Sequence, residues 1–413
     1  MLNPKTNQRE LCYIVTVGKI EPMVGYDNLE LATVNGWHCV IGKDSMKEGD
    51  LAIYFEIDSK LPEAKPFCDN MAIVKYKYKI KTQKFGRGGI KYLSQGLLMP
   101  LSDFEELGLK NVKEGDFLTK QLGVTYWDPE DNKRKSNAAI TSKYMSMRAR
   151  HPKLAKTKLF KWLFKREWGK KLLFFFLGKK KDKPTDWPAW VVKTDEERIQ
   201  NCFEHRKSLG IKWMVTEKID GTSTTFTMKQ AKPKKRELLV CSRNVVFNKP
   251  EKEDKNFYRD TDGNVYLAMA EKYEIERLLN MILDDNPELE YITIQGETFG
   301  GSIQKRNYGN EHRMAIFNII YKKNGEAPQR MNPKDMYEQV EWWNLCRSFN
   351  LETVPVLDYK YELPETVEEI LAYAGSLHSM IDGGMREGVV FRSEDGVHSF
   401  KAVDNEFLLR YHQ

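Results

Sequence analysis

The distribution of apolar residues predicts short strands over the first 125 residues. One β-rich apolar run covers 11–20, and a second covers 29–41 with an interruption at Gly36-Trp37. In the stretch 51–58 the aliphatic and aromatic residues at odd positions alternate with other residues, which is the period of a half-buried strand. Short strands with glycine-containing turns are typical of a small barrel, and the OB-fold is a barrel of this size that binds nucleic acid.

From about residue 190 the pattern predicts a mixed α+β domain. Helical periodicity covers 271–283 and 333–349. Strand-like runs cover 213–216, 238–241, 291–294, 314–321, 388–392 and 399–403. Because 413 residues exceed the usual size of one domain, we expect more than one. The predicted organisation is an OB-like domain over 1–125, a linker or insert over 126–187 and a second domain over 188–413.

The predicted insert carries most of the positive charge of the chain. The stretch 132–183 contains 18 Lys and Arg and two acidic residues, so its charge of +16 exceeds the +7 of the whole chain. Phe160, Leu163, Phe164 and Trp168 suit one side of a basic amphipathic helix. The stretch is either a solvated linker or an element that binds a polyanion. Such a helix could bind RNA, an anionic membrane surface or the body of the protein, and we favour the body because exposed aromatic residues are costly.

Composition and motifs exclude several other classes of protein. No apolar run reaches the roughly 18–20 residues of a membrane span, and the N-terminus has no signal-peptide core. The six cysteines form no Cys-x-x-Cys pair, which argues against a zinc site or a disulfide framework. The sequence also contains no P-loop and no His-Glu-x-x-His motif. We therefore expect a soluble intracellular protein, in the cytoplasm or an equivalent reducing compartment.

A basic stretch in the first domain is a candidate surface for nucleic acid. Its lysines alternate with aromatic and aliphatic residues: Lys75, Lys77, Lys79 and Lys81 with Tyr76, Tyr78 and Ile80 between them. On a strand this spacing would place four cations on one face. That face could follow a phosphate backbone, with Phe85 and Arg87 of the next loop nearby, or it could be an ordinary polar outer face.

The segment Glu217-Lys218-Ile219-Asp220-Gly221-Thr222-Ser223 contains the strongest candidate for a catalytic group. Lys218 follows an apolar run and precedes a polar, glycine-containing turn. An ordinary lysine has a pKa near 10.4, so making its amine neutral at pH 7 costs roughly 4–5 kcal/mol. Desolvation and neighbouring cations reduce this cost, and a neutral lysine can attack phosphorus. A divalent ion beside a triphosphate would need carboxylates, and the candidates are Asp220, Glu297 and Glu387.

Six segments resemble, in order, the motifs of the covalent nucleotidyltransferase superfamily of polynucleotide ligases and capping enzymes. They are the segment containing Lys218, Cys-Ser-Arg-Asn ending at Asn244, Ile-Gln-Gly-Glu ending at Glu297, Ala-Ile-Phe-Asn-Ile around Phe317, Arg-Glu-Gly-Val-Val-Phe-Arg around Glu387, and Ser399-Phe400-Lys401. The last segment departs from the usual Lys-x-Lys pattern, because Ser399 stands at its first position.

The resemblance implies a role for each of these residues. Lys218 would be the nucleophile, and Arg243 would bind phosphate. Glu297 would contact the ribose or the hydration shell of the metal ion, Phe317 would stack on the purine, Glu387 would be a carboxylate on the metal side, and Lys401 alone would hold the α-phosphate. Glu217 and Gly221 would complete the nucleotide-binding set, and Asp220 would join Glu297 and Glu387 at the metal.

The first domain narrows the resemblance to one clade. Gly36-Trp37, the run 49–59 and Leu93-Ser94-Gln95-Gly96-Leu97 resemble the N-terminal OB domain of one group of ATP-dependent RNA ligases. Capping enzymes and most DNA ligases have this domain after the catalytic one. The implied fold is α+β, with an OB-like β-barrel followed by an ATP-grasp-like nucleotidyltransferase domain of antiparallel sheets.

The implied activity is ATP-dependent RNA ligation that uses Mg²⁺ or Mn²⁺. The enzyme would join 3′-OH and 5′-phosphate RNA ends through a lysyl-AMP intermediate and an adenylylated RNA 5′ end, sealing nicked duplexes in repair as a monomer. Two alternatives remain open: a ligase for DNA or mixed polymers, and a nucleic-acid-binding protein whose nucleotidyltransferase pocket is degenerate. Ser399 is the only residue that favours the second alternative.

Overall fold

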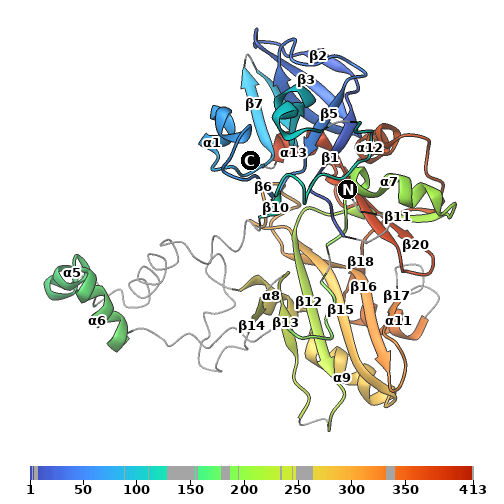
Figure 1. Cartoon of the computed structure of the whole chain (residues 1–413). Coiled ribbons are helices and arrows are strands. Elements are labelled where there is room, and N and C mark those ends of the chain that lie inside the picture. Colours follow the sequence, from blue (N-terminus) through green and yellow to red (C-terminus); the bar gives the residue numbers. More distant parts are fainter. Residues whose placement is uncertain are drawn as a thin grey trace.

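The computed structural model (Figure 1) has two groups of strands, one built from each half of the chain. It describes residues 1, 3, 8–87, 89–109, 111–127, 154, 157–177, 187–193, 195–232, 235–243, 245–247, 264–331 and 340–411. No helix among these residues is both long enough and apolar enough to cross a membrane. All six cysteines lie in these ranges and are free thiols.

Short antiparallel strands form the N-terminal domain, as the apolar pattern predicts. One sheet has the order β1-β5-β9 and another the order β2-β3-β4, while β7 and β8 form a hairpin and β10 pairs with β6. The bounds are β1 Cys12–Thr16, β2 Ile20–Pro22, β3 Leu29–Val34, β4 Trp37–Gly42, β5 Leu51–Phe55, β6 Ser59–Lys60, β7 Gln83–Arg87, β8 Ile90–Ser94, β9 Leu97–Pro100 and β10 Thr125–Tyr126. Two 3-10 helices, Phe67–Asp69 and Leu101–Leu107, also belong to this domain.

Strand β5 is buried on both faces, although its alternating pattern predicts one exposed face. Ile53 and Phe55 pack into one apolar cluster, and Ala52 and Tyr54 pack into a second cluster on the opposite face. The reason is tertiary, because β5 is the central strand of its sheet and lies between two layers of side chains. Ala52 and Tyr54 are apolar enough for a core, so the strand itself is correctly predicted.

The predicted strand over the lysines at 75–81 is wrong. The helix α1 (Met71–Lys75) ends at Lys75, and the Asn70 side chain caps it by accepting from the Ala72 and Ile73 amides. A turn follows in which Lys77 and Tyr78 have φ of 54° and 60°. This left-handed backbone breaks the alternation that a strand requires. Lys75, Lys77, Lys79 and Lys81 therefore do not form one cationic face.

The C-terminal domain is built on two sheets. Four strands have the order β19-β11-β20-β21, and the seven-stranded sheet has the path β14-β13-β12-β15-β16-β17, with β18 beside β16. All pairings are antiparallel except β16 with β18. The bounds are β11 Trp213–Lys218, β12 Thr222–Lys229, β13 Leu239–Cys241, β14 Val246–Phe247, β15 Leu289–Phe299, β16 Arg313–Lys323, β17 Gln329–Met331, β18 Glu352–Thr353, β19 Val356–Tyr361, β20 Gly388–Ser393 and β21 Ser399–Val403.

Helices cover the outer faces of these sheets. The amphipathic helix α9 (Ile275–Asp285) buries Leu278, Leu279 and Ile282 against the seven-stranded sheet, in the largest apolar cluster of the protein. The helices α7 (Ile199–Ser208) and α12 (Val367–Ser376) cover the four-stranded sheet. Among the described residues of this domain, the other helices are α8 Val265–Lys272, α11 Val340–Ser348 and α13 Asn405–Tyr411. Their packing leaves the space between the two sheets free for a cavity.

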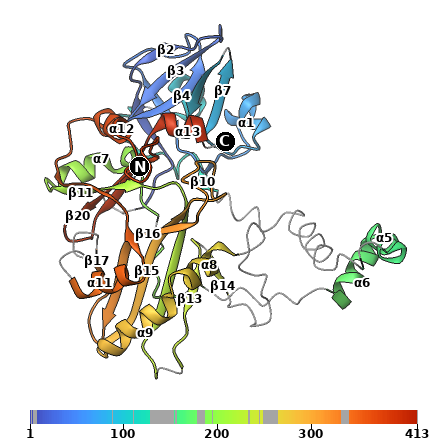
Figure 2. The ribbon, with the colours of Figure 1, turned by 180° about the vertical axis from the view of Figure 1, so that it is seen from behind.

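The two domains contact each other directly. Leu93 of β8 packs with Val403 and with Leu408 of α13. A Cβ atom on Gly36, whose φ is +74°, would lie 2.6 Å from Val367 Cγ1 of α12, so only glycine fits at this contact. Both views place α12, α13 and α7 beside the N-terminal domain (Figures 1 and 2). The domains therefore share an apolar interface.

The basic insert contributes two helices to the structure, α5 (Lys158–Phe164) and α6 (Glu167–Leu177). The Thr157 side chain caps α5, and the two helices pack on each other through Trp162 and Trp168, whose rings lie 5.8 Å apart. Both tryptophans remain about half exposed, at 49% and 55%. Figures 1 and 2 show the pair apart from both domains, so the favoured docking onto the body is not observed.

Candidate active site

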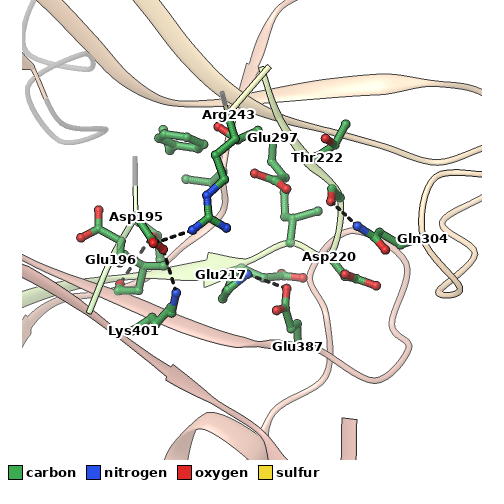
Figure 3. A pocket seen from close by; sticks show the side chains of 18 of the residues that line it. Asp195, Glu196, Glu217, Asp220, Thr222, Arg243, Glu297, Gln304, Glu387 and Lys401 are labelled. Carbon is green, nitrogen blue, oxygen red and sulfur yellow. Dashed lines mark hydrogen bonds and ion pairs between the residues drawn. The ribbon is translucent and has the colours of Figure 1, made fainter. Parts of the chain in front are cut away.

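A cavity of about 620 Å³ lies between the two sheets of the C-terminal domain. Lys218 is the last residue of β11 in the four-stranded sheet, and the next three residues cross to β12 in the seven-stranded sheet. Both sheets therefore contribute side chains to one pocket (Figure 3). The predicted site residues that line it are Glu217, Lys218, Asp220, Gly221, Arg243, Glu297, Phe317, Glu387 and Lys401.

The crossing between the sheets requires glycine at position 221. A Cβ atom there would lie 2.3 Å from the Thr298 carbonyl oxygen and 2.9 Å from Glu297 Cγ. Any larger residue would push the crossing away from β15. The close approach holds Lys218 and Asp220, on one side of the crossing, near Glu297 of β15.

The amine of Lys218 is held by a carboxylate. Its Nζ donates to Glu387 Oε2 at 2.7 Å, and Glu387 directly precedes β20, the strand that pairs with β11. Burial lowers the pKa of Lys218, but the charges of Glu387, Glu297 and Asp220 together outweigh it and raise the pKa above its ordinary value. In this pocket the carboxylates therefore outweigh the desolvation that was expected to favour the neutral amine.

Glu297 lies opposite Ser223 in the pairing of β12 with β15, which brings it beside Lys218. Burial is the largest effect on this group. Lys218 opposes it, while Glu387 and Asp220 add to it, and the pKa of Glu297 rises to about 8. Burial is therefore the main reason that Glu297 holds its proton at neutral pH, and the charges of Glu387 and Asp220 add to it.

On the other side of the pocket, Asp195 bridges two cations. Arg243 Nη2 lies 2.5 Å from Asp195 Oδ2, and Lys401 Nζ lies 3.3 Å from Asp195 Oδ1 (Figure 3). Burial lowers the pKa of Lys401, with Lys218 and Arg198 acting in the same direction against Asp195. The carboxylate of Asp195 thus neutralises two cations that could bind phosphate.

The remaining predicted residues occupy the walls of the pocket. Phe317 lies on β16, and its carbonyl oxygen accepts from Arg392 Nη1 at 2.5 Å. Lys401 lies on β21 opposite Val390. The Glu217 carboxylate is already occupied, because it accepts from the Ser379 hydroxyl at 2.5 Å and the Met380 amide at 2.8 Å. Glu217 therefore fixes the end of β11 through its side chain.

The carboxylates of the pocket fit a divalent cation by their chemistry. Asp220, Glu297 and Glu387 all line the cavity and supply the oxygen ligands that Mg²⁺ and Mn²⁺ prefer. Within the described part of the chain no three acidic, His or Cys side chains form a preformed metal cluster. Mg²⁺ commonly takes one or two carboxylates and keeps several waters, so this arrangement suits an ion that arrives with phosphate.

Sequence reasoning missed several residues in and around this pocket. Asp195 bridges the two cations, and Glu196 accepts a hydrogen bond from the Ser399 hydroxyl. Tyr308 accepts from the Asp220 amide at 3.1 Å, and Arg392 is buried beneath Phe317. Of these four residues, only Arg392 could have been identified from the sequence, because it ends the segment that contains Glu387.

The predicted nucleic-acid residues do not belong to this pocket. Lys75, Lys77, Lys79 and Lys81 lie on a helix end and a turn of the N-terminal domain, and two of them lie over one tryptophan ring. The distances from Lys79 and Lys81 Nζ to the Trp127 ring are 4.3 and 4.5 Å. Arg87 ends β7 and donates to the Gly25 carbonyl oxygen.

Comparison with protein families places two known domains on this chain. Residues 211–403 match the family described as RNA ligase, and residues 11–101 match an OB-fold domain. No curated protein sequence shows significant similarity to the chain. The two family matches cover the same two groups of strands that the structure separates.

Solved structures of the RNA ligase of Naegleria gruberi are similar over almost the whole chain. A mutant with ATP and Mn has 27% identity and a TM-score of 0.61, covering 97% of this chain and 99% of that one. Another mutant with AMP and Mn has 28% identity and a TM-score of 0.61, with 98% and 99% coverage. The same ligase with PPi has 28% identity and a TM-score of 0.60, with 98% and 99% coverage.

The RNA ligase match spans the residues from Glu217 to Lys401 that line the pocket, and the OB-fold match precedes it. The predicted fold, an OB-fold domain followed by a mixed α+β domain of antiparallel sheets, is confirmed. An RNA ligase domain over 211–403 thus follows the OB-fold domain, and together with the structural match over almost the whole chain it indicates an ATP-dependent RNA ligase.

Proposed function

We propose that this protein seals RNA through a covalent lysyl-AMP intermediate on Lys218. Three transfers are involved. The Lys218 amine attacks the α-phosphorus of ATP and pyrophosphate leaves. The RNA 5′-phosphate then attacks the adenylyl phosphorus and frees the lysine. Finally the RNA 3′-OH attacks the activated 5′-phosphate, AMP leaves, and a 3′–5′ phosphodiester remains.

One observation carries this proposal: two cations face a group of carboxylates across a single lysine. Arg243 and Lys401 share Asp195 on one side of the cavity, while Glu387 holds Lys218 on the other. The cations suit the negative charge that builds up on a transferred phosphate. The carboxylates suit Mg²⁺ or Mn²⁺ bound with ATP, as in the Naegleria structures that contain ATP and Mn.

Lys218 must lose a proton before it can attack. Glu387 stabilises the charged amine at 2.7 Å, and the raised pKa of Lys218 keeps it protonated at neutral pH. A bound divalent cation would supply positive charge that offsets Glu387 and Glu297 and neutralises the departing pyrophosphate. Glu387 lies within hydrogen-bonding distance of the amine and is placed to accept its proton.

The other groups hold the nucleotide. Phe317 presents its ring to the cavity, where it would stack on the purine, and Arg243 and Lys401 would contact the phosphates once Asp195 releases them. Ser399, where a second lysine is common, donates its hydroxyl to Glu196. We therefore assign the contact with the α-phosphate to Lys401 alone. Asp220 and Glu297 complete the carboxylate side.

The first experiment asks whether Lys218 carries AMP. Protein incubated with ATP and Mg²⁺ or Mn²⁺ should gain the mass of one AMP, and Lys218→Ala should gain none. Lys212→Ala is the matched control, because Lys212 lies on the same segment in an exposed ion pair with Glu362. AMP that remains covalently bound to Lys218→Ala would refute the assignment.

The second experiment identifies the polymer. We propose RNA with 3′-OH and 5′-phosphate ends in a nicked duplex, and a repair role in a reducing compartment. An enzyme that reads the 2′-OH should seal a nick with RNA on its 3′-OH side and fail with DNA there. Equal sealing of both duplexes would favour the mixed-polymer alternative. Absence of the AMP increment in the unmodified protein would favour the other alternative, a nucleic-acid-binding protein whose nucleotidyltransferase pocket is degenerate.

A further inference from the structure

Outside the pocket, the β7–β8 hairpin of the OB-fold domain carries lysines on the face that meets the ligase domain. In its antiparallel register Lys84 lies opposite Leu93, and Gly86 lies opposite Lys91. Residues two apart on a strand share a face, so Lys84, Lys91 and Leu93 point to the same side. Leu93 packs on Leu408 of α13, which identifies that side as the interface with the ligase domain.

Lys91 extends over the glycine opposite it. A Cβ atom placed on Gly86 would lie 3.6 Å from Lys91 Cγ, so the stem of Lys91 crosses the bare backbone of β7. The rest of its side chain is exposed. Lys84 reaches further, and its Nζ donates to the Leu408 and Leu409 carbonyl oxygens at 2.5 and 3.1 Å. Lys84 thus joins the hairpin to the C-terminal end of α13, where a cation is favourable.

The ligase domain contributes a third lysine, Lys305, to this seam, which is the interface between the β7–β8 hairpin and the ligase domain. Burial, followed by the charges of Lys91 and Lys305, lowers the pKa of Lys84, which places Lys305 near the hairpin. Lys305 is exposed and follows Gln304, whose side chain lines the active-site cavity and donates to the Gly221 carbonyl oxygen at 3.0 Å. The seam therefore reaches from the hairpin to the crossing that carries Lys218.

Lysines of the two domains lie near each other at this seam, and their positive charges repel one another. Folding alone does not require them, because Lys91 and Lys305 are both exposed and any polar residue would suit such positions. A polyanion would offset the repulsion through phosphate contacts and counterion release. An RNA strand running into the active site has phosphates at every nucleotide and would pass this seam.

We propose that Lys91 and Lys305 form an interdomain phosphate track that seats the RNA backbone next to the active site, with Lys84 fixing the hairpin beneath it. This inference rests on the proposed ligase function and assigns its RNA contact to the β7–β8 hairpin in place of the Lys75–Lys81 segment. The track exists only while the two domains are docked, because each contributes one of its lysines.

The size of the effect follows from counterion release. Each phosphate contact contributes a slope of about 0.7 for single strands and about 0.9 for duplex in a plot of log affinity against log salt. Two contacts therefore contribute a slope of about 1.6. Over the decade from 1 M to 0.1 M salt this slope corresponds to about 1.6 log units, or roughly 40-fold, in affinity. Either lysine alone should account for about half of this slope.

Equilibrium binding of the full-length protein to a 5′-phosphorylated nicked RNA duplex, without ATP, tests the track. We expect the double variant Lys91→Ala/Lys305→Ala to bind roughly 40-fold more weakly at 0.1 M salt and to lose about 1.6 from the salt slope. Each single variant should lose about 0.8. The matched control is Lys113→Ala, an exposed lysine of the same domain that lies beside Glu114 and Asp116 in the sequence.

Three outcomes would overturn the proposal. The double variant could bind RNA with the affinity and salt slope of the unmodified protein. Lys113→Ala could lose as much as the double variant, which would indicate a general charge effect. The lost slope could also belong wholly to one lysine, which would remove the interdomain track. Absence of an AMP mass increment in the unmodified protein would instead refute the ligase proposal, so the two failures are distinguishable.

Discussion

Asp195 lies between two cations that we propose bind a phosphate group of ATP. Its two oxygens lie 2.5 Å from Arg243 Nη2 and 3.3 Å from Lys401 Nζ. Both ion pairs must break before phosphate can bind there. We therefore expect Asp195→Asn to bind ATP more tightly than the unmodified protein, because the amide carries no charge to compete.

The exposure of these ion pairs determines how much more tightly Asp195→Asn should bind ATP. Asp195 and Arg243 are each 55% exposed and Lys401 is 21% exposed, so these pairs are worth little in water. Exposed pairs contribute about 0.2–1 kcal/mol each, so two pairs give roughly 0.4–2 kcal/mol. This corresponds to an ATP affinity that is roughly 2- to 30-fold tighter in Asp195→Asn.

Equilibrium binding of ATP and of adenosine measures this effect in metal-free protein. ATP should bind Asp195→Asn more tightly, while adenosine, which has no phosphate, should bind both proteins equally. Glu362→Gln is the control for the loss of one negative surface charge, because Glu362 is exposed and pairs with Lys212. Weaker or unchanged ATP binding by Asp195→Asn would show that the carboxylate does not compete with phosphate.

Three further predictions concern the carboxylates and the frame of the pocket. Burial, opposed by Lys218 and supported by Glu387 and Asp220, raises the pKa of Glu297 to about 8, so the folded protein keeps a proton that the unfolded chain releases above pH 4.5. Glu297 should therefore lower the stability of the metal-free protein as pH rises from about 4.5 to 8, and thermal melts of Glu297→Gln should show a smaller loss over that range; an equal loss would contradict this sign. Glu387→Gln should lower the pKa of Lys218, so the amine-directed labelling of Lys218 in metal-free protein should begin at lower pH, and an unshifted profile would contradict the ion pair. Tyr308→Phe removes the hydroxyl that accepts from the Asp220 amide and should cost about 1–2 kcal/mol of stability in denaturant unfolding; no change would mean that another group satisfies this amide.

Several strands of both domains were predictable because the apolar pattern that indicates them lies within the strand itself. The runs ending near Lys218, Cys241 and Val403 and the run containing Phe317 are apolar enough to indicate strands without tertiary information. Their order then identified the pocket, since each motif residue lies on or next to a strand. The pattern also placed α9, whose apolar stripe faces one sheet.

The lysine stretch shows where local reading fails. Alternation at 75–81 satisfies the period of a strand, but the capping of α1 by Asn70 and the positive φ of Lys77 and Tyr78 decide otherwise. Periodicity reports which side chains share a face only if the backbone is already extended. Here the RNA-facing lysines that we infer come from separate places, Lys91 on β8 and Lys305 after β15.

The sequence by itself determined which residues could carry the chemistry, because nucleophile, cations and carboxylates occur in a recognisable order. Only the tertiary structure decided their charge states. Lys218 and Glu387 are 169 residues apart, yet their atoms lie 2.7 Å apart and raise the pKa of the amine. Asp195 had no signal in the sequence, since its role depends on Arg243 and Lys401 meeting it from two different sheets. Electrostatic energies depend on distance and burial in space, which a linear pattern does not contain.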